Sequence, residues 1–344
     1  MNLNNLEEKV WIAGPCAAEN REQVLETAFQ LRDEAQKRNL KLFAYRAGAW
    51  KIRSTPDSFE GAGNTALTWL QEVQDTLNIP VCVEVVTANH VEVCAKHNVK
   101  MFWVGARTSV NPAEIQKIAD AVKNTNFTVM VKNPIIPDLK LWIGNIERFL
   151  NANVKSVMAI HRGFADISEN ILRNSPMWEI PIDLKVKMPH LPIFCDPSHI
   201  TGNINWIQQI SQIAINYGFN GLMLETHNNP KKALSDSSQQ LTPTEWGELI
   251  SSLSLRSNID SIDLEKLRSK LQNIDNQLSE LLYQRMTIVD EIAKVKKENN
   301  ISVVQPKQWE QVVKRYKNHS EDTVYQEFIN DFLELLHQNS IRRQ

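Results

Sequence analysis

The sequence predicts an α/β protein, a (β/α)8 or TIM barrel, followed by a small all-α domain of three helices. Three observations carry this prediction. Eight short apolar runs alternate with segments of helical periodicity over the first three quarters of the chain. Each run ends close to a polar residue, and a parallel barrel builds its active site at the C-terminal ends of its strands. Beyond Leu264 the sequence contains no strand-like run.

The eight apolar runs have the length of buried strands. They are residues 9–13, 41–45, 80–85, 100–104, 128–131, 155–160, 191–195 and 220–224. Apolar residues between the runs recur every three or four positions, which predicts helices. These segments are residues 21–38, 65–77, 88–97, 112–123, 139–150 and 204–217. The alternation predicts βα units and a parallel sheet; an open doubly wound sheet is the alternative that the pattern leaves open.

The last quarter of the chain has a different character. The division predicted is a barrel over residues 1–253, a Ser-rich linker over 254–262 and a helical domain over 263–344. A long helix is expected from Leu264 to a break at Asn299, then one near residues 306–316 and one near 323–340. Three helices make a thin core, so this domain is expected to need a partner surface. The simplest partner is its own copy, in a homodimer or a larger homo-oligomer.

Composition restricts the classes of function. The 344 residues are 42% hydrophobic and 23% charged, with a net charge of −2, which is ordinary for a soluble globular protein. Nothing in this balance favours a nucleic acid or a membrane as partner. We see no signal peptide and no apolar run long enough to span a bilayer, so a cytoplasmic protein with reduced cysteines is expected. Cys82 and Cys195 lie inside apolar runs and read as buried structural thiols.

Cationic residues follow several of the predicted strands. They are Arg46, Lys51, Arg53, Arg107, Lys132 and Arg162. A single such residue is usually a solvated loop charge. Six at one barrel mouth would repel one another unless an anion lay between them. The planar guanidinium of arginine suits carboxylate and phosphate groups.

A second set of residues could hold a metal ion. Cys16, His199, Glu225 and Asp236 follow strands one, seven and eight of the predicted barrel. A thiolate, an imidazole and two carboxylates suit a divalent first-row transition ion better than calcium or magnesium. The alternative for His199 is a loop histidine whose ring is satisfied by backbone groups.

Six motifs occur in order over residues 10–253: IAGPCAAEN, YRAGAWKIRSTPDSFEGAG, VGARTS, HRGF, DPSH and LETHNNPKKALSD. Together they resemble the short microbial class of 3-deoxy-D-arabino-heptulosonate-7-phosphate synthase. The resemblance implies that phosphoenolpyruvate condenses with erythrose 4-phosphate, water adds and phosphate leaves. It also implies a divalent metal ion, manganese above all, with cobalt, zinc or iron as alternatives.

The resemblance assigns roles to residues of the predicted barrel mouth. It gives the metal to Cys16, His199, Glu225 and Asp236. It assigns the binding of phosphoenolpyruvate to Arg46, Lys51, Arg107, Lys132 and Arg162, with the backbone near Ala106. It also makes Lys51 a catalytic residue. It gives the sugar phosphate to Arg53, Ser54 and Asp196, and it gives Glu84 the orientation of a water or a lysine. Ile52 and Ser54 depart from the Lys-Pro-Arg-Thr of the family, which puts the loop geometry in doubt.

The helical tail carries basic residues at regular spacing. Arg285 and Lys296 are 11 positions apart, so they point the same way, whereas Arg268 lies about 100° round the helix. The run LEKLRSKLQNIDNQLSELLYQRMTIVDEIAKVKKE, with HQNSIRRQ at the end, resembles the all-helical chorismate mutase over residues 263–344.

That second resemblance implies an intertwined dimer that rearranges chorismate. Arg285 and Lys296 would bind its carboxylates and ether oxygen, and Arg268 would come from the partner chain. Ser340 would bind substrate, and Gln344 would complete the catalytic set. Catalysis would come from holding a compact conformer and stabilising separated charge.

Three residues depart from the mutase pattern. Gln305 stands where an acid is common. Gln308 and Trp309 stand where the family often has Arg and Glu. The first interpretation is therefore a bifunctional synthase and mutase, with a mutase of reduced strength. The second makes the tail an allosteric sensor of chorismate or prephenate, and the third is an aldolase-type barrel with a dimerisation tail.

Overall fold

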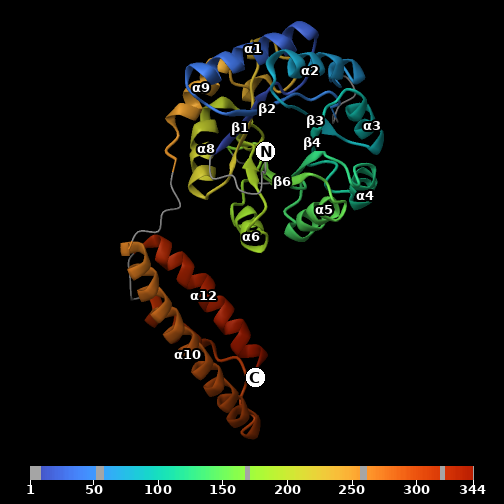
Figure 1. Cartoon of the computed structure of the whole chain (residues 1–344). Coiled ribbons are helices and arrows are strands. Elements are labelled where there is room, and N and C mark those ends of the chain that lie inside the picture. The colour runs from blue at the N-terminus through green and yellow to red at the C-terminus, as the bar shows by residue number, and fades with distance from the viewer. Residues whose placement is uncertain (1–8, 52–57, 167–170, 256–261, 318–321, 344) are drawn as a thin grey trace. The chain divides into compact units, whose positions relative to one another are not determined.

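The computed structural model describes residues 9–51, 58–166, 171–255, 262–317 and 322–343, with residues 262–264 described as backbone only. The chain divides into two compact units, Met1–Arg256 and Ser257–Gln344. Figure 1 shows a ring of strands enclosed by helices in the first unit and long helices in the second. No helix among the described residues has the length and apolarity needed to cross a membrane.

The first unit is a closed parallel barrel in which every strand pairs with its sequence neighbour and β8 pairs with β1. The strands are β1 (Val10–Gly14), β2 (Leu42–Arg46), β3 (Val81–Val85), β4 (Met101–Val104), β5 (Thr128–Lys132), β6 (Ser156–His161), β7 (Ile193–Cys195) and β8 (Gly221–Glu225). The pairing of β8 with β1 confirms the barrel and excludes the open doubly wound sheet.

Helices surround the barrel and connect its strands. They are α1 (Arg21–Lys37), α2 (Asn64–Leu77), α3 (Ala88–Lys96), α4 (Pro112–Ala121), α5 (Leu139–Asn151), α6 (Glu179–Lys187), α7 (Pro197–Thr201), α8 (Ile207–Asn216) and α9 (Pro243–Ser252). Short 3-10 turns are η2 (Ile204–Trp206), η3 (Pro230–Lys232) and η4 (Ser237–Gln239). Three of these helices, α6, α7 and α9, were not among the predicted segments. Helix α6 has a proline in its first turn and buries only Pro181 and Leu184, so its sequence shows little helical periodicity.

Five of the turns from a helix into the next strand contain an asparagine in the left-handed conformation. These residues are Asn39, Asn78, Asn98, Asn124 and Asn153, all with φ between 53° and 57°. Asparagine tolerates this conformation better than other non-glycine residues. The turns stop each helix and direct the chain back to the barrel, so that all eight strands of the described barrel end at the same rim.

The barrel has two apolar layers. Residues such as Ile12, Met130 and Phe194 fill the interior, and a larger layer of buried side chains lies between strands and helices. Cys82 belongs to the interior and Cys195 to the outer layer, which confirms that both are buried thiols. The filled interior makes the barrel a solid support for the polar groups at the C-terminal rim.

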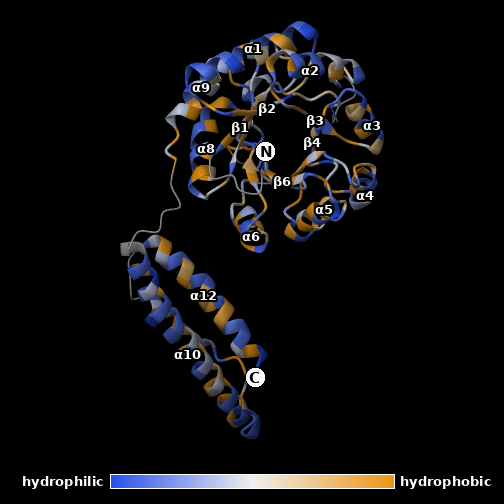
Figure 2. Cartoon of the chain, in the orientation of Figure 1, coloured by the Kyte–Doolittle hydropathy of each residue, from blue (hydrophilic) through white to orange (hydrophobic). Residues whose placement is uncertain are grey.

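The second unit consists, in its described part, of α10 (Ile262–Glu298), α11 (Pro306–Lys317) and α12 (Thr323–Arg342). Its buried apolar residues are Val289, Ile329, Leu333 and Leu336. Figure 2 shows further apolar positions spaced along α10 and α12. Many of them are exposed in the single chain, as Leu267 (60%) and Leu281 (61%) illustrate.

Candidate active sites

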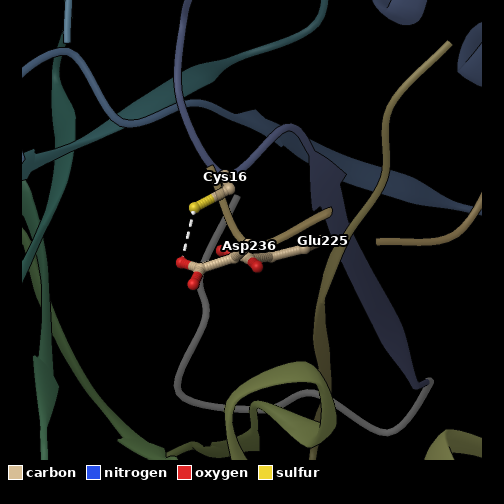
Figure 3. Close-up of side chains that lie close together, drawn as sticks. All are labelled: Cys16, Glu225 and Asp236. Carbon is tan, nitrogen blue, oxygen red and sulfur yellow. Dashed lines mark hydrogen bonds between the residues drawn. The ribbon is translucent and has the colours of Figure 1, made fainter. Parts of the chain in front are cut away.

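Three of the predicted metal ligands meet at the C-terminal rim of the barrel (Figure 3). Cys16 follows β1, Glu225 ends β8, and Asp236 precedes η4. One ligand atom of each lies within 4.8 Å of the others. The Cys16 Sγ donates a hydrogen bond to Asp236 Oδ2 at 3.1 Å.

The fourth predicted ligand, His199, lies beside this cluster. Its Nε2 is 3.8 Å from Glu225 Oε1. The ring does not lie within 4.8 Å of all three ligand atoms of the cluster. Asp196 holds the ring from the other side, with Nδ1 2.9 Å from its Oδ1. This arrangement directs Nε2 toward the cluster, as carboxylate–histidine pairs do behind metal ions. Burial lowers the pKa of His199, with the charges of Asp196 and Glu225 opposing the shift.

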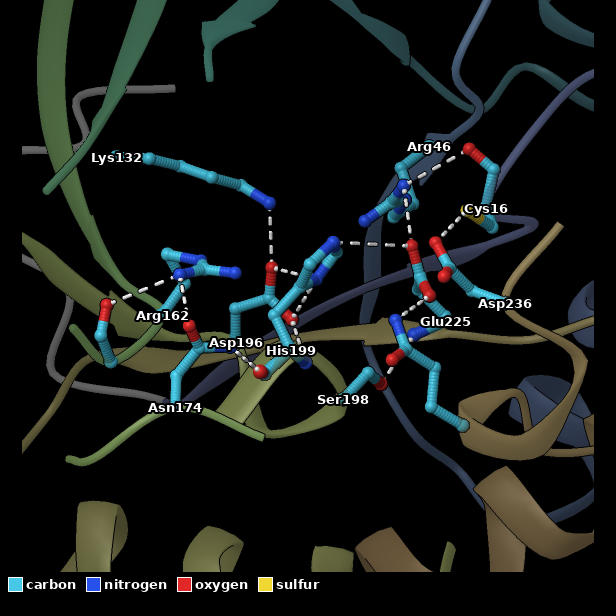
Figure 4. Close-up of polar contacts among 12 residues, drawn as sticks. Cys16, Arg46, Lys132, Arg162, Asn174, Asp196, Ser198, His199, Glu225 and Asp236 are labelled. Atoms are coloured by element: carbon cyan, nitrogen blue, oxygen red, sulfur yellow. Dashed lines mark hydrogen bonds and ion pairs between the residues drawn. The ribbon is translucent and has the colours of Figure 1, made fainter. Parts of the chain in front are cut away.

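Buried cations neutralise these acids (Figure 4). Arg46 ends β2 and its Nη2 is 3.1 Å from Glu225 Oε1, with both side chains almost fully buried. Its guanidinium also lies over the ring of Trp103 at 4.7 Å. Lys132 ends β5 and pairs with Asp196 Oδ2 at 2.6 Å. Removing one member of such a buried pair would leave the other charge uncompensated in a dry environment.

Lys51 lies directly against the candidate thiol ligand. Its Nζ donates to the Cys16 carbonyl oxygen at 2.9 Å and lies 3.1 Å from Cys16 Sγ. Burial is the main cause that raises the pKa of Cys16 to about 12. The thiol is therefore protonated near neutral pH, and a metal ion would have to displace that proton.

A cavity of about 230 Å³ opens above these groups. Its walls include Lys51, Glu84, Ala106, Arg107, Lys132, Arg162 and His199. The Glu84 carboxylate lies where a side chain at residue 105 would be, since a Cβ on Gly105 would come 1.9 Å from its Oε1. Burial is the main cause that lowers the pKa of Arg162 to about 10; Asp196 opposes this shift, and Arg173 and Arg107 add to it.

Some predicted substrate contacts do not reach the described cavity. Asp196 is fully buried, and its carboxylate is engaged by Lys132 and His199 rather than facing the open space. Arg53 and Ser54 lie outside the described residues.

Sequence reasoning missed three residues of this rim. Arg173 and Asn174 line the cavity from the loop between β6 and α6. Asn174 accepts a hydrogen bond from Arg162 at 2.7 Å and donates one to the His199 carbonyl at 2.6 Å. Gln239 donates to Glu225 Oε2 at 2.6 Å. For Arg173 and Asn174 the available signal was the long segment between the sixth and seventh apolar runs, because long βα loops form the active-site face of such barrels.

The helical unit has a cavity of its own, also of about 230 Å³. Arg285 from α10 donates to Ser340 Oγ of α12 at 2.9 Å, and Lys296 donates to the Val303 carbonyl at 2.7 Å. Three of the five side chains predicted for this site line the cavity: Arg285, Lys296 and Ser340. Trp309 also lines it and stacks on His337 with 4.0 Å between ring centroids.

Two further residues were predicted for this second site. Arg268 lies on α10 as an exposed residue and is not among those that line the cavity. That Arg268 serves a pocket in a partner chain stays a prediction. Gln344 lies outside the described residues.

Comparison with known proteins divides the chain in the same way. The model of the DAHP synthetase I family matches residues 5–257, and the model of chorismate mutase type II matches residues 267–344. The phospho-2-dehydro-3-deoxyheptonate aldolase of Thermotoga maritima is 30% identical over 239 residues, which cover 70% of this chain and 67% of that protein. A 2-dehydro-3-deoxyphosphooctonate aldolase of Legionella pneumophila is 26% identical over 264 residues, covering 70% of this chain and 89% of the relative.

A solved structure supports the same assignment. The crystal structure of the Thermotoga maritima DAHP synthase superposes with a TM-score of 0.63 at 28% identity, covering 76% of this chain and 70% of that one. The match of the first family model to most of the chain, together with the second match behind it, leads to one conclusion. The chain belongs to the DAHP synthetase I family and carries a chorismate mutase type II domain at its C-terminal end, and it is a bifunctional enzyme of the shikimate pathway.

Proposed function

We propose that the barrel catalyses a metal-dependent, aldol-like condensation of phosphoenolpyruvate with erythrose 4-phosphate. Water adds, phosphate leaves, and the product is 3-deoxy-D-arabino-heptulosonate 7-phosphate. The observation that carries the proposal is the meeting of Cys16, Glu225 and Asp236 within 4.8 Å, beside a cavity lined by cations.

The donor set fits a divalent transition ion. Cys16, Glu225 and Asp236 supply sulfur and oxygen, and the Nε2 of His199 faces Glu225. One soft donor, one imidazole and two carboxylates favour manganese, iron, cobalt or zinc over calcium. Bound there, the ion would act as a Lewis acid on the aldehyde of the sugar phosphate.

The cations of the rim would bind and orient phosphoenolpyruvate. Lys51, Arg107, Lys132 and Arg162 line the cavity, and Arg46 lies below it against Glu225. The two substrates together carry about −5 near neutral pH, from two phosphates and one carboxylate. Cations in a low-dielectric rim suit substrates with this negative charge, because opposite charges attract strongly there.

The remaining roles stay proposals. Lys51, next to the Cys16 thiol and inside the cavity, is the candidate to hold or move a proton during the reaction. Glu84 lines the same cavity as Lys51, and we propose that it orients Lys51 or a water. We keep Arg53, Ser54 and Asp196 as candidates for the sugar phosphate.

The barrel proposal is tested with metal-stripped full-length protein, phosphoenolpyruvate and erythrose 4-phosphate. We expect no phosphate release until manganese, cobalt or zinc is added back. Cys16→Ser should lose most of the metal-restored rate, whereas the matched change Cys94→Ser on α3 should retain it. Full activity in the stripped protein, or none after any of the three ions, would contradict the proposal.

For the tail we propose the rearrangement of chorismate to prephenate in a homodimer. Arg285 and Lys296 share one cavity with Ser340, which suits a substrate with two carboxylates and an ether oxygen. Arg268 of a second copy and Gln344 would complete the site. The exposed apolar positions of α10 support a dimer, because a lone chain leaves them in water.

A second function of the tail is supported by one observation. Gln308 and Trp309 line its cavity, where the resemblance leads us to expect an arginine and a glutamate. The tail could then bind chorismate or prephenate and regulate the synthase with little catalysis of its own. Chorismate consumption by the full-length protein separates the two functions, as does the synthase rate at saturating prephenate.

A further inference from the structure

Arg173 is a cation of the barrel rim to which no role has been assigned above. It lies between β6 and α6, lines the cavity, and its side chain is 42% exposed. Its Nη1 donates to Asp236 Oδ1 at 3.1 Å and to Gln239 Oε1 at 2.7 Å. Gln239 in turn donates to Glu225. Arg173 thus contacts one candidate metal ligand directly and a second one through a single amide.

The fold builds a fixed support for this arginine. The backbone N–H groups of Arg173 and Asn174 donate to the carbonyls of Thr201 and Ile200 at the end of α7. Gly202 follows with φ of 69°, and a Cβ there would lie 2.6 Å from the Arg173 Cβ. The glycine therefore leaves the space in which the arginine stem rests.

Each acidic ligand candidate of the described cluster has a cation beside it. Lys51 Nζ is 3.1 Å from Cys16 Sγ, Arg46 Nη2 is 3.1 Å from Glu225, and Arg173 Nη1 is 3.1 Å from Asp236. Arg46 is locked, with 1% of its side chain exposed. Arg173 is 42% exposed at the solvent edge, so solvent screens its ion pair with Asp236 more than the fully buried pair of Arg46.

A divalent ion and this guanidinium would compete for Asp236. An ion bound to the Asp236 carboxylate would come within a few ångströms of a positive charge, and the two repel. Because the arginine stem is held by its loop, the guanidinium can leave Asp236 without leaving the cavity. Arg162 and Arg107 already face that space, so the released cation would add to an anion-binding group.

We propose that Arg173 is a phosphate-binding residue whose guanidinium is paired with Asp236 while the metal ion is absent. A divalent ion that binds Asp236 displaces the guanidinium, which then binds the phosphate group of a phosphomonoester substrate in the cavity. The proposal rests on the proposed function of the barrel. It couples the two ligands, because a cation freed by the metal raises the affinity for phosphate, and bound phosphate must raise the affinity for the metal by the same factor.

The test measures Mn²⁺ binding to metal-stripped full-length protein by equilibrium dialysis, without substrates. Arg173→Met removes the competing charge, so we expect Mn²⁺ to bind about 3- to 10-fold more tightly. Arg173→Lys keeps the charge and should stay nearer to the wild type. Arg32→Met, on α1 and paired with Asp33, makes the same change in net charge away from the rim and should leave the affinity unchanged. Thermal unfolding verifies that each variant is folded.

A second readout follows the released guanidinium. At saturating Mn²⁺, Arg173→Met should raise the KM for phosphoenolpyruvate about tenfold, because Arg107 and Arg162, which the guanidinium would join, are the cations proposed to bind that substrate. The KM for erythrose 4-phosphate should change much less. Unchanged or weaker Mn²⁺ binding in Arg173→Met would overturn the proposal and make Arg173 a residue that merely orients Asp236. That result would leave the barrel function standing, since the wild type would still bind Mn²⁺. A wild type that binds no Mn²⁺, Co²⁺ or Zn²⁺ would overturn both.

Discussion

The barrel and the helical unit bury their apolar side chains to very different extents. In the barrel, Trp103, Trp142 and Trp246 are all enclosed within one chain. In the helical unit, Leu281 and Phe328 are 61% and 62% exposed. A barrel closes its sheet on itself and covers it with its own helices, whereas three helices of this size cannot enclose an apolar stripe on both sides.

The two candidate sites differ in the same sense. The barrel rim places Arg46 and Glu225 in a fully buried ion pair. In the tail, Lys296 rests on a backbone carbonyl and Arg285 on a serine hydroxyl. The barrel site is therefore held by charges within one chain, whereas the contacts named for the two tail cations are with neutral groups. This contrast fits the proposal that a second copy completes the tail site. The predictions below test this difference.

The largest effect is expected from Glu225→Gln in the barrel. The change removes a candidate metal ligand and leaves Arg46 without its buried counter-charge. We expect the synthase rate to fall more than about 100-fold, beyond the loss typical of groups that only support a ligand. Chorismate turnover should remain, because Glu225 belongs to the other unit. Both rates are measured on the same full-length preparation.

The matched control is Glu114→Gln on α4, which breaks an exposed pair with Lys117. It should leave both rates near those of the wild type. Loss of both activities in Glu225→Gln would show that the two units are not independent, and the contrast between them would fail.

The counterpart in the tail is Arg285→Ala. This guanidinium donates to Ser340 and lines the cavity with Lys296, so its loss removes a cation facing the substrate carboxylates. We expect chorismate turnover to fall about 100-fold, as when one charge-stabilising donor is removed from an active site. Arg315→Ala on α11, outside the cavity, is the control. Undiminished turnover in Arg285→Ala would remove the assignment of this cavity.

The fold and much of the barrel rim could be predicted, because both follow local rules. A strand that ends in Arg46, Lys132 or Glu225 necessarily delivers that side chain to the C-terminal rim. The partner that each residue contacts there was not predictable. The pairing of His199 with Asp196 within a turn of helix depends on the start of α7, and the sequence shows no helical periodicity over so short a segment.

The contacts of Arg173 could not be predicted for a different reason. It lies in a loop without periodicity, and its place over Gly202 depends on backbone hydrogen bonds to α7. Such contacts join segments far apart in sequence and leave no local pattern. In the tail, the sequence predicts an apolar stripe on the first helix. The surface that covers this stripe was not predictable, because it does not belong to the same chain in the proposed dimer.

The barrel should also be the acid-sensitive unit, through His161. Trp142, Phe164, Trp178 and Phe219 surround its ring. Burial lowers the pKa of His161 to about 3, against about 6.5 in an unfolded chain. The stability that the neutral ring contributes is fully present above pH 6.5 and is lost as the pH falls from 6.5 toward 3. At pH 5 the loss amounts to about 2 kcal/mol.

His161→Phe should reduce the loss of barrel stability between pH 7 and pH 5 by about 2 kcal/mol. Urea unfolding at the two pH values, followed by tryptophan fluorescence, measures this difference. The same replacement at the exposed His190 should not alter the pH dependence. An unchanged slope in His161→Phe would mean that the buried ring does not control acid stability.

Association of the tail can be tested with Ile274→Glu on α10. Ile274 is 59% exposed in the single chain and lies on the apolar stripe, so a buried carboxylate there would oppose a dimer. We expect association to weaken about tenfold or more, seen by sedimentation, with chorismate turnover falling in proportion and the synthase rate retained. Asn273→Glu adds the same charge about 100° round the helix and should be milder. Equal effects of the two changes would argue against a dimer through this stripe.

The smallest effect is expected from Gln308→Arg combined with Trp309→Glu, which separates the two functions proposed for the tail. Trp309 lines the cavity and stacks on His337 at 4.0 Å, so an aromatic wall stands where a charge would help to hold a polar substrate. If the tail is a weakened mutase, restoring the pair should raise kcat/KM for chorismate, by less than about tenfold because Arg285 and Lys296 already bind the carboxylates. If the tail is a sensor, little chorismate turnover is expected in either protein. The synthase rate should then respond to prephenate in the wild type and respond less in the variant, because the variant lacks the aromatic wall of the cavity. Chorismate consumption, and the synthase rate with and without prephenate, are measured on both proteins. These rates decide whether the cavity of the helical unit is used for chemistry or for control of the barrel.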